Sequence, residues 1–115
     1  MTADYEQAVA DHIIDLCEED GRSIALIELI PKPSYLLIEN VAVLPERHGN
    51  GIGGLLLDRA ETVARSLALR EVRLYTNAMF STNIAFYARR GFEEFLREPR
   101  ADGGAVVHMK KALVP

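Results

Sequence analysis

Four glycines fall within six consecutive positions of the chain, at Gly49, Gly51, Gly53 and Gly54. Because glycine has no Cβ, the backbone of such a segment can approach a ligand closely. The helix predicted to follow adds free N–H groups and the positive end of its dipole, and together these features favour phosphate. The segment carries little charge of its own, since only Arg47 and a protonated His48 are cationic. The spacing therefore predicts a phosphate-binding loop, with a glycine-rich turn that binds no ligand as the alternative.

Two other nucleotide-binding loops fit this segment less well. No Gly-Lys-Ser or Gly-Lys-Thr follows the glycines, which excludes a Walker-type nucleotide site. The spacing Gly49-x-Gly51-x-x-Gly54 formally matches the dinucleotide fingerprint, but that fingerprint also needs an acidic residue at the end of the next strand. Glu71 lies at the right distance but precedes the strand, and 115 residues are few for a doubly wound domain. Dinucleotide binding is therefore the weaker interpretation.

Glu39 stands within an apolar stretch that is predicted to form a strand. A charge at such a position needs a partner or a purpose, so Glu39 is either a general base or a residue that faces solvent or a cation. Glu28 presents the same choice with less reason to select it. Cys17 has no neighbouring base and is predicted to be a small core residue. No metal site is predicted, because metal-ligand spacing is missing among the histidines His12, His48 and His108.

The glycine loop is predicted to lie between a β-hairpin and a long helix. Residues 23–30 and 35–44 are rich in apolar residues and predict two strands, joined by a proline-containing turn at 31–34. Both strands are apolar on both faces, which predicts a sheet covered on both sides. Residues 52–69 are predicted to be helical, with Glu61 and Arg65 as a favourable i,i+4 pair. Its apolar stripe comprises Ile52, Leu55, Leu56, Ala60, Val63, Ala64 and Leu67.

A strand at 72–76 completes a strand–helix–strand unit, so its two strands should be parallel with a right-handed crossover. A second helix at 82–90 should end at Gly91 in the left-handed conformation, with Arg89 and Arg90 complementing its dipole. Strands at 92–97 and 105–111 follow, joined by a polar turn at 99–104. Residues 3–11 are predicted to be helical, and residues 12–17 either continue that helix or form a strand. The fold class is α/β or α+β with a mixed sheet.

The length of 115 residues predicts a single domain over residues 1–115. A net charge of −4 does not suit sequence-independent nucleic-acid binding, and we expect no nucleic-acid partner. One cysteine excludes an intrachain disulfide. No segment reaches the ~18 apolar residues of a membrane helix, and the first residues are acidic and polar, unlike a secretory signal. We expect a cytoplasmic protein without membrane association.

Two segments resemble motifs of the GNAT N-acetyltransferases. Residues 41–56, VAVLPERHGNGIGGLL, are similar to the acetyl-CoA loop of that family, V-x-P-x-x-(Q/R)-x-x-G-x-(G/A). Residues 74–92 are similar to a second family pattern, L-Y-T-N-x-x-M-x-x-N-x-x-(L/F)-Y-x-x-x-G-(F/Y). Both occur in the expected order, separated by a helix and a strand, and the resemblance extends over residues 12–113.

The resemblance implies that acetyl-CoA is the co-substrate. It also implies a mixed, mostly antiparallel sheet with a central parallel strand pair and helices on both faces. In this family the parallel strands splay apart and the pantetheine arm pairs with the first of them, here at Val41, Ala42 and Val43. The pyrophosphate lies on the loop, here on the backbone of Gly49, Asn50, Gly51, Ile52, Gly53 and Gly54.

The sequence departs from the family pattern at three positions. His48 stands at the Q/R position and Asn50 at the usual basic position two residues further on, which implies weaker phosphate binding. Many family members carry an asparagine where this chain has Phe80. Asn77 and Asn83 are the nearby amides that could contact coenzyme A instead.

The implied reaction is direct attack on the thioester by a primary amine of a small molecule or peptide. Tyr87 matches the residue that commonly faces the CoA sulfur, so it is the candidate general acid, with a buried core tyrosine as the alternative. Glu39 is the candidate base, acting directly or through water. A backbone N–H near Val43 is the expected oxyanion donor.

Family members usually begin with a strand and two helices before the strand at 12–17, and that region helps to form the acceptor pocket. Here only the end of the second helix, at residues 3–11, would be present. We therefore expect a homodimer that completes the fold, with a truncated or minimal form as the alternative. The alternative function is a GNAT-like domain that binds acyl-CoA or a protein partner without turnover.

Overall fold

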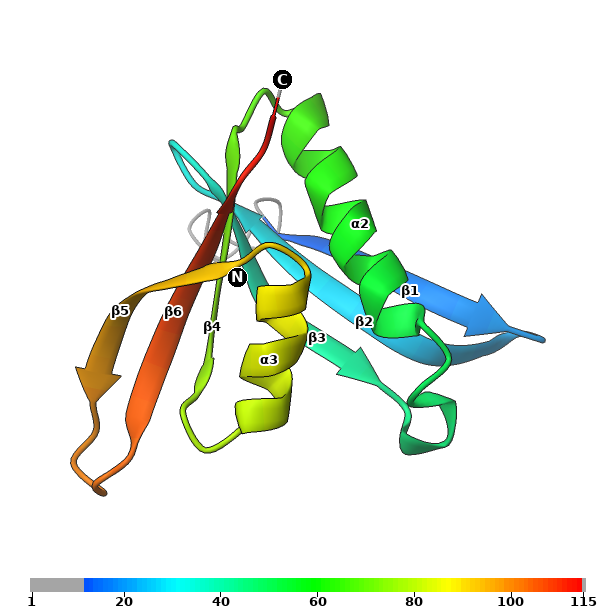
Figure 1. The fold of residues 1–115 in the computed structure, drawn as a ribbon. Helices are drawn as coiled ribbons and strands as arrows, with labels where there is room; N and C mark the ends of the chain where they lie inside the picture. The colour runs from blue at the N-terminus through cyan, green and yellow to red at the C-terminus, as the bar shows by residue number, and fades with distance from the viewer. Residues whose placement is uncertain (1–11, 115) are drawn as a thin grey trace, which may run out of the picture.

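The computed structural model describes residues 12–114, which form a six-stranded sheet and two α-helices (Figure 1). The strands lie side by side in the order β1-β2-β3-β4-β6-β5. Their bounds are β1 (Ile13–Glu19), β2 (Arg22–Pro31), β3 (Leu36–Val43), β4 (Glu71–Asn77), β5 (Glu93–Pro99) and β6 (Ala105–Ala112). The helical elements are the 3₁₀ turn η1 (Pro45–Arg47) and the helices α2 (Ile52–Ser66) and α3 (Ser81–Arg89).

The pairing of the strands confirms the predicted mixed sheet. β3 and β4 are parallel, and every other neighbouring pair of described strands is antiparallel. The predicted hairpin is formed by β2 and β3, with Lys32 N–H donating to the Tyr35 carbonyl at 2.8 Å in the turn. The first strand is β1, so the strand interpretation of residues 12–17 is confirmed. The helix predicted at residues 3–11 lies outside the described residues.

The hydrophobic core lies between the sheet and α2. Its largest fully buried side chains are Ile27, Leu29, Leu36, Leu57, Met109, Val72 and Val107. The predicted stripe of α2 is correct at Leu56, Ala60, Val63 and Ala64, which are all buried. It is wrong at Leu55, which is 65% exposed, whereas the neighbouring Leu57 is 1% exposed. The helix packs its buried residues Leu57, Ala60 and Ala64 on the sheet. Leu55 lies roughly half a turn around the helix axis from Leu57, so its side chain faces solvent.

The helix α2 ends at Ser66, three residues before the predicted end. Ala68 adopts a φ of 60°, and this left-handed conformation stops the helix. Leu67, predicted to belong to the apolar stripe, is the C-cap and is 44% exposed. After α3, Gly91 has a φ of 94°, as its place in the sequence predicted.

Both described helices cover the same side of the sheet (Figure 1). Arg90, at the end of α3, forms an ion pair with Asp58 of α2, and a Cβ built on Gly53 would lie 3.5 Å from the Phe86 ring. On the opposite side, β2 presents partly exposed Leu26, Glu28 and Ile30 instead of the buried residues of its helix side. Within residues 12–114, no helix covers this second face. The predicted helices on both faces are therefore not found in the part of the chain that the structure describes.

The strands β3 and β4 pair only at the start of their run. Leu36, Leu37 and Ile38 match Val72, Arg73 and Leu74, after which the two strands diverge (Figure 1). On its other edge, β3 contains a bulge, because Glu28 pairs with Asn40 and Leu29 with Ile38, which leaves Glu39 as the extra residue. A bulge bends its strand and re-aims a side chain. The bulge therefore coincides with the point at which β3 leaves β4, and the predicted splay is confirmed.

Neither described helix is long and apolar enough to cross a membrane.

Candidate active site

The glycine loop presents open backbone at the start of α2. Gly49 and Gly51 have φ values of 83° and 79°, and a Cβ added to either would meet nothing within 4 Å. These glycines are thus required by backbone conformation rather than by lack of space. Gly51 is the N-cap and makes no side-chain cap, and the first turn of α2 has no acidic residue. The first-turn N–H groups have no partner within the helix, so they can receive an anion.

A groove of about 600 Å³ runs from β3 over this loop to α3. Eleven of the residues predicted to bind coenzyme A line it: Val41, Ala42, Val43, His48, Gly49, Gly51, Ile52, Gly53, Gly54, Asn83 and Tyr87. Two further candidates, Asn50 and Asn77, do not line the groove. The folded chain therefore gathers the strand, the loop and the second helix motif around one cavity, as the resemblance implied.

His48 does not extend from the loop as a free cation. Its Nε2 lies 2.8 Å from the carbonyl oxygen of Val43, which only accepts hydrogen bonds, so Nε2 carries the proton. The ring thereby ties the loop back to the end of β3. Arg47 is also bound, because its Nη2 pairs with Glu19 of β1. Its Nε is buried and has no hydrogen-bond partner within residues 12–114.

A second hollow of about 310 Å³ lies between the diverging ends of β3 and β4. Val41, Asn83 and Tyr87 line both this hollow and the groove. Its other lining residues include Glu39, Tyr75, Asn77, Phe80 and Arg100. The two cavities therefore adjoin at Tyr87, and a group held at the end of the groove can meet a group that enters from the hollow.

The phenol of Tyr87 is largely surrounded by protein. Its ring packs edge-on against Phe86 and Phe92, with centroid distances of 5.6 and 6.1 Å. Burial raises the pKa of Tyr87 above the ordinary value for tyrosine. The hydroxyl therefore keeps its proton at neutral pH and is available as a donor. The side chain of Tyr87 packs against the core and is also partly exposed in the cavity walls. It is therefore both a core tyrosine and a lining residue of the site.

Glu39 is bound by a tyrosine rather than by a cation. The hydroxyl of Tyr75 donates to Oε1 of Glu39 at 2.8 Å, and this hydrogen bond is the main cause that raises the pKa of Tyr75. The bond holds the carboxylate in the wall of the hollow that Tyr87 also lines. Oε2 of Glu39 forms no hydrogen bond with any residue that the structure describes, which leaves it able to accept a proton.

The remaining candidates lie elsewhere. Glu28 pairs with His12 at 2.6 Å and lines neither cavity. His108 pairs with Glu98 across the β5–β6 hairpin. Cys17 is half-buried and packs against the core. Within residues 12–114, no three His, Cys, Asp or Glu side chains converge as a metal-binding group would.

Several lining residues were not among the sequence candidates. Arg89 and Arg90 were interpreted only as partners of the helix dipole, and Phe86 was not considered, yet all three line the groove. Tyr75 and Arg100 likewise line the hollow. The adjacent arginines three and four residues after Phe86 were the visible signal in the sequence. Their use depends on how α3 approaches α2, which no local spacing encodes.

Comparison with known proteins agrees with this arrangement. The sequence profile described as an acetyltransferase (GNAT) domain matches residues 10–94. An uncharacterized N-acetyltransferase from Methanocaldococcus jannaschii is 30% identical over 86 residues, which cover 69% of this chain and 38% of that protein. The matched region thus spans less than half the length of this curated relative.

Two solved structures illustrate the likeness in fold. A GNAT family acetyltransferase from Elizabethkingia anophelis, with acetyl-CoA bound, has a TM-score of 0.85 at 17% identity, over 95% of this chain and 81% of that one. The PaiA N-acetyltransferase from Thermoplasma acidophilum, in complex with coenzyme A, has a TM-score of 0.75 at 25% identity, over 93% and 64% of the two chains. On the profile match and the shared fold, this chain belongs to the GNAT acetyltransferase family.

Proposed function

We propose that the protein transfers an acetyl group from acetyl-CoA to a primary amine. One observation carries the proposal: Tyr87 lies where the glycine-loop groove meets the hollow that contains Glu39. This arrangement gives one entrance to a long phosphorylated donor and another to the acceptor. The Tyr87 hydroxyl lies on the wall that the two cavities share, and the Glu39 carboxylate lies on the wall of the hollow.

The groove suits the donor for two physical reasons. Beyond Ile38, β3 has no β4 partner, so its edge can pair with the amide-containing pantetheine arm along Val41, Ala42 and Val43. At the far end, the N–H groups of the first turn of α2 can receive the pyrophosphate. Acetyl-CoA supplies the activated thioester, and this chain supplies the strand edge and the helix N–H groups that hold it.

The acceptor nitrogen attacks the thioester carbonyl carbon directly. The C–N bond forms first and gives a tetrahedral oxyanion, which a backbone N–H near Val43 stabilises, and the C–S bond breaks as this intermediate collapses. Glu39 accepts the proton of the amine, either directly or through one water, and Tyr87 donates its proton to the departing thiolate sulfur. Transfer of a proton from Glu39 to the Tyr87 phenolate through solvent restores both groups, and no covalent enzyme intermediate is needed.

The acceptor in this proposal is a primary amine of a small molecule or a peptide. The hollow is open to solvent and is lined by both apolar and polar side chains, including Phe80, Tyr75 and Arg100. Such a surface suits an acceptor that has an apolar portion next to its amine.

Thermal unfolding with and without acetyl-CoA tests the proposal, with NAD as the matched control. Ligand at 100 times its dissociation constant adds about 2.7 kcal/mol to the free energy of unfolding. In a domain near 100 residues, each kcal/mol raises the unfolding midpoint by roughly 4–8 °C. We expect a rise on the order of 10 °C with acetyl-CoA and none with NAD. An equal response to both ligands, or to neither, contradicts the proposal.

A second candidate function, acyl-CoA binding without turnover, has one observation in its favour. His48 stands at the loop position where the family pattern has glutamine or arginine, but its Nε2–H donates a hydrogen bond to the Val43 carbonyl oxygen. If acetyl-CoA raises the unfolding midpoint while a panel of amines and amino-terminal peptides releases no free thiol, this second candidate is favoured. Release of thiol that depends on an amine establishes the transferase.

A further inference from the structure

We propose that Arg90 binds a phosphate of coenzyme A, and that it supplies from α3 the cation that the glycine loop lacks. The inference rests on the proposed function and concerns one side chain of the same groove. Arg90 is the C-cap of α3, and no motif of the loop includes it. The shared chemistry is a phosphate ester, either the pyrophosphate or the 3′-phosphate of the nucleotide.

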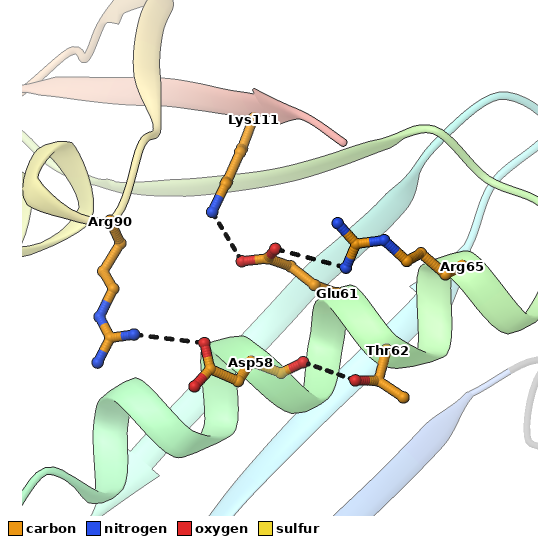
Figure 2. Close-up of polar contacts among 6 residues, drawn as sticks. All are labelled: Asp58, Glu61, Thr62, Arg65, Arg90 and Lys111. Atoms are coloured by element: carbon orange, nitrogen blue, oxygen red, sulfur yellow. Dashed lines mark hydrogen bonds and ion pairs between the residues drawn. The ribbon is translucent and has the colours of Figure 1, made fainter. Parts of the chain in front are cut away.

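The guanidinium of Arg90 lies against the first turns of α2. It reaches Asp58 at 3.3 Å between Nη1 and Oδ1 (Figure 2), and it lies 5.9 Å from the centre of the Phe86 ring. A Cβ placed on Gly54 would be 1.7 Å from Nη2, so the guanidinium occupies the space that any other residue would fill there. The charge is therefore held at the end of α2 where anions are favoured.

The contact with Arg90 bears on the absence of a side chain at Gly54. Unlike Gly49 and Gly51, it has no left-handed φ, and glycine disfavours a helix. Its backbone conformation alone therefore does not call for glycine. A Cβ at this position would displace the guanidinium of Arg90, which lies over the Gly54 Cα. Glycine therefore leaves room for the cation at the start of α2.

Arg89 lines the groove as well, but the guanidinium that lies against the first turns of α2 is that of Arg90. Other cations nearby are engaged. Arg47 pairs with Glu19, and His48 donates to the Val43 carbonyl. Lys111 and Arg65 both pair with Glu61, further along α2 (Figure 2). Asp58 contacts only one nitrogen of Arg90, and this ion pair is exposed. The remaining donors of Arg90 match the fork of oxygens on a phosphate.

Calorimetric titration with coenzyme A and with dephospho-CoA tests the proposal. We expect Arg90→Gln to weaken coenzyme A binding at least about tenfold, as expected for loss of a charge-assisted hydrogen bond. Arg65→Gln removes the same charge from the far end of α2 and serves as the matched control, with binding changed less than about twofold. Thermal unfolding of each variant verifies that it is folded.

The two ligands distinguish the two phosphates. If Arg90 contacts the 3′-phosphate, the variant and the wild type bind dephospho-CoA equally; if it contacts the pyrophosphate, the loss is the same for both ligands. Wild-type binding with an unchanged dissociation constant for Arg90→Gln overturns the inference and leaves the proposed function standing. Failure of the wild type to bind coenzyme A overturns both.

A second variant tests the role of Gly54. In Gly54→Ala the new methyl displaces the guanidinium, so we expect weaker coenzyme A binding together with a higher unfolding midpoint, because alanine favours the helix. In the Arg90→Gln background the same change should alter binding little, since there is no guanidinium left to displace. Equal losses in both backgrounds would show that Gly54 acts on the ligand independently of Arg90.

Discussion

Tyr87 is the residue on which the proposed chemistry depends most. Its hydroxyl is the only side-chain donor among the predicted catalytic residues, and burial keeps it protonated at neutral pH. Glu39 complements it, because the Tyr75 hydroxyl fixes one carboxylate oxygen and leaves the other free of the described residues. Tyr87 thus offers a hydrogen-bond donor and Glu39 an acceptor oxygen, as a general acid and a general base require.

Replacement of Tyr87 by phenylalanine separates catalysis from binding. General acid catalysis contributes about 10²-fold or more, so we expect kcat to fall by about that factor. The ring still packs against Phe86 and Phe92, so the dissociation constant for acetyl-CoA should change less than about twofold. Steady-state kinetics and calorimetry measure the two quantities. An unchanged kcat would remove Tyr87 from the mechanism.

The same residue predicts a pH dependence of stability. Its pKa is higher in the folded chain than in the unfolded chain, so its contribution to stability is present below the unfolded pKa and is lost as the pH rises through the folded value. Tyr75 acts in the same direction. We expect the urea midpoint of the wild type to fall above about pH 10, and to fall less steeply in Tyr87→Phe. Parallel curves for the two proteins would contradict this.

At the scale of the element, the rotation of α2 about its axis decides which leucines stabilise the fold. Leu57 is buried against the sheet, whereas its neighbour Leu55 is mostly exposed. The sequence stripe included Leu55 because it counted apolar residues at helical spacing. Because residues 55–57 are all leucines, either Leu55 or Leu57 can belong to an apolar stripe at helical spacing. Only the packing of α2 on β2, β3 and β4 selects Leu57.

Alanine substitution at these two leucines measures the difference. We expect Leu57→Ala to lower the free energy of unfolding by about 2–5 kcal/mol, because it leaves a cavity in the core. Leu55→Ala should cost less than about 0.5 kcal/mol, since exposed substitutions have small effects. Denaturant unfolding of both variants gives the values. Comparable losses at the two positions would mean that the helix packs with a different face.

At the scale of the whole molecule, the edge strand β1 carries exposed apolar residues. Ile14 and Leu16 are 59% and 54% exposed and belong to the same side of the strand. An exposed apolar edge strand is suited to association with another chain. We propose that a second copy of this chain associates at this surface.

Sedimentation velocity tests the homodimer. We expect a dimer at micromolar concentration for the wild type, and a monomer when Ile14 and Leu16 are both replaced by lysine, since charges oppose pairing at a sheet edge. Circular dichroism verifies that the double variant keeps its sheet. A wild type that is folded and monomeric at every concentration would contradict this association.

Local sequence predicted most of the fold and most of the candidates that line the groove. Apolar segments, the turn at 31–34 and the helix-ending Gly91 fix elements by contacts within a few residues, so the hairpin, the parallel pair and both helices followed from spacing. The glycines at 49 and 51 likewise predicted a loop at the start of a helix, and both have a positive φ in the structure. Ordered motifs along one chain then predicted the family, which the profile match confirms.

Only the tertiary structure decided how residues distant in sequence meet. The hydrogen bond of Tyr75 with Glu39, the tie of His48 to Val43 and the guanidinium of Arg90 over Gly54 depend on strand register, the bulge at Glu39 and the approach of α3 to α2. Those quantities arise from packing over the whole sheet rather than from any short segment. Spacing can therefore predict a phosphate-binding loop, but only packing decides which cation lies beside that loop.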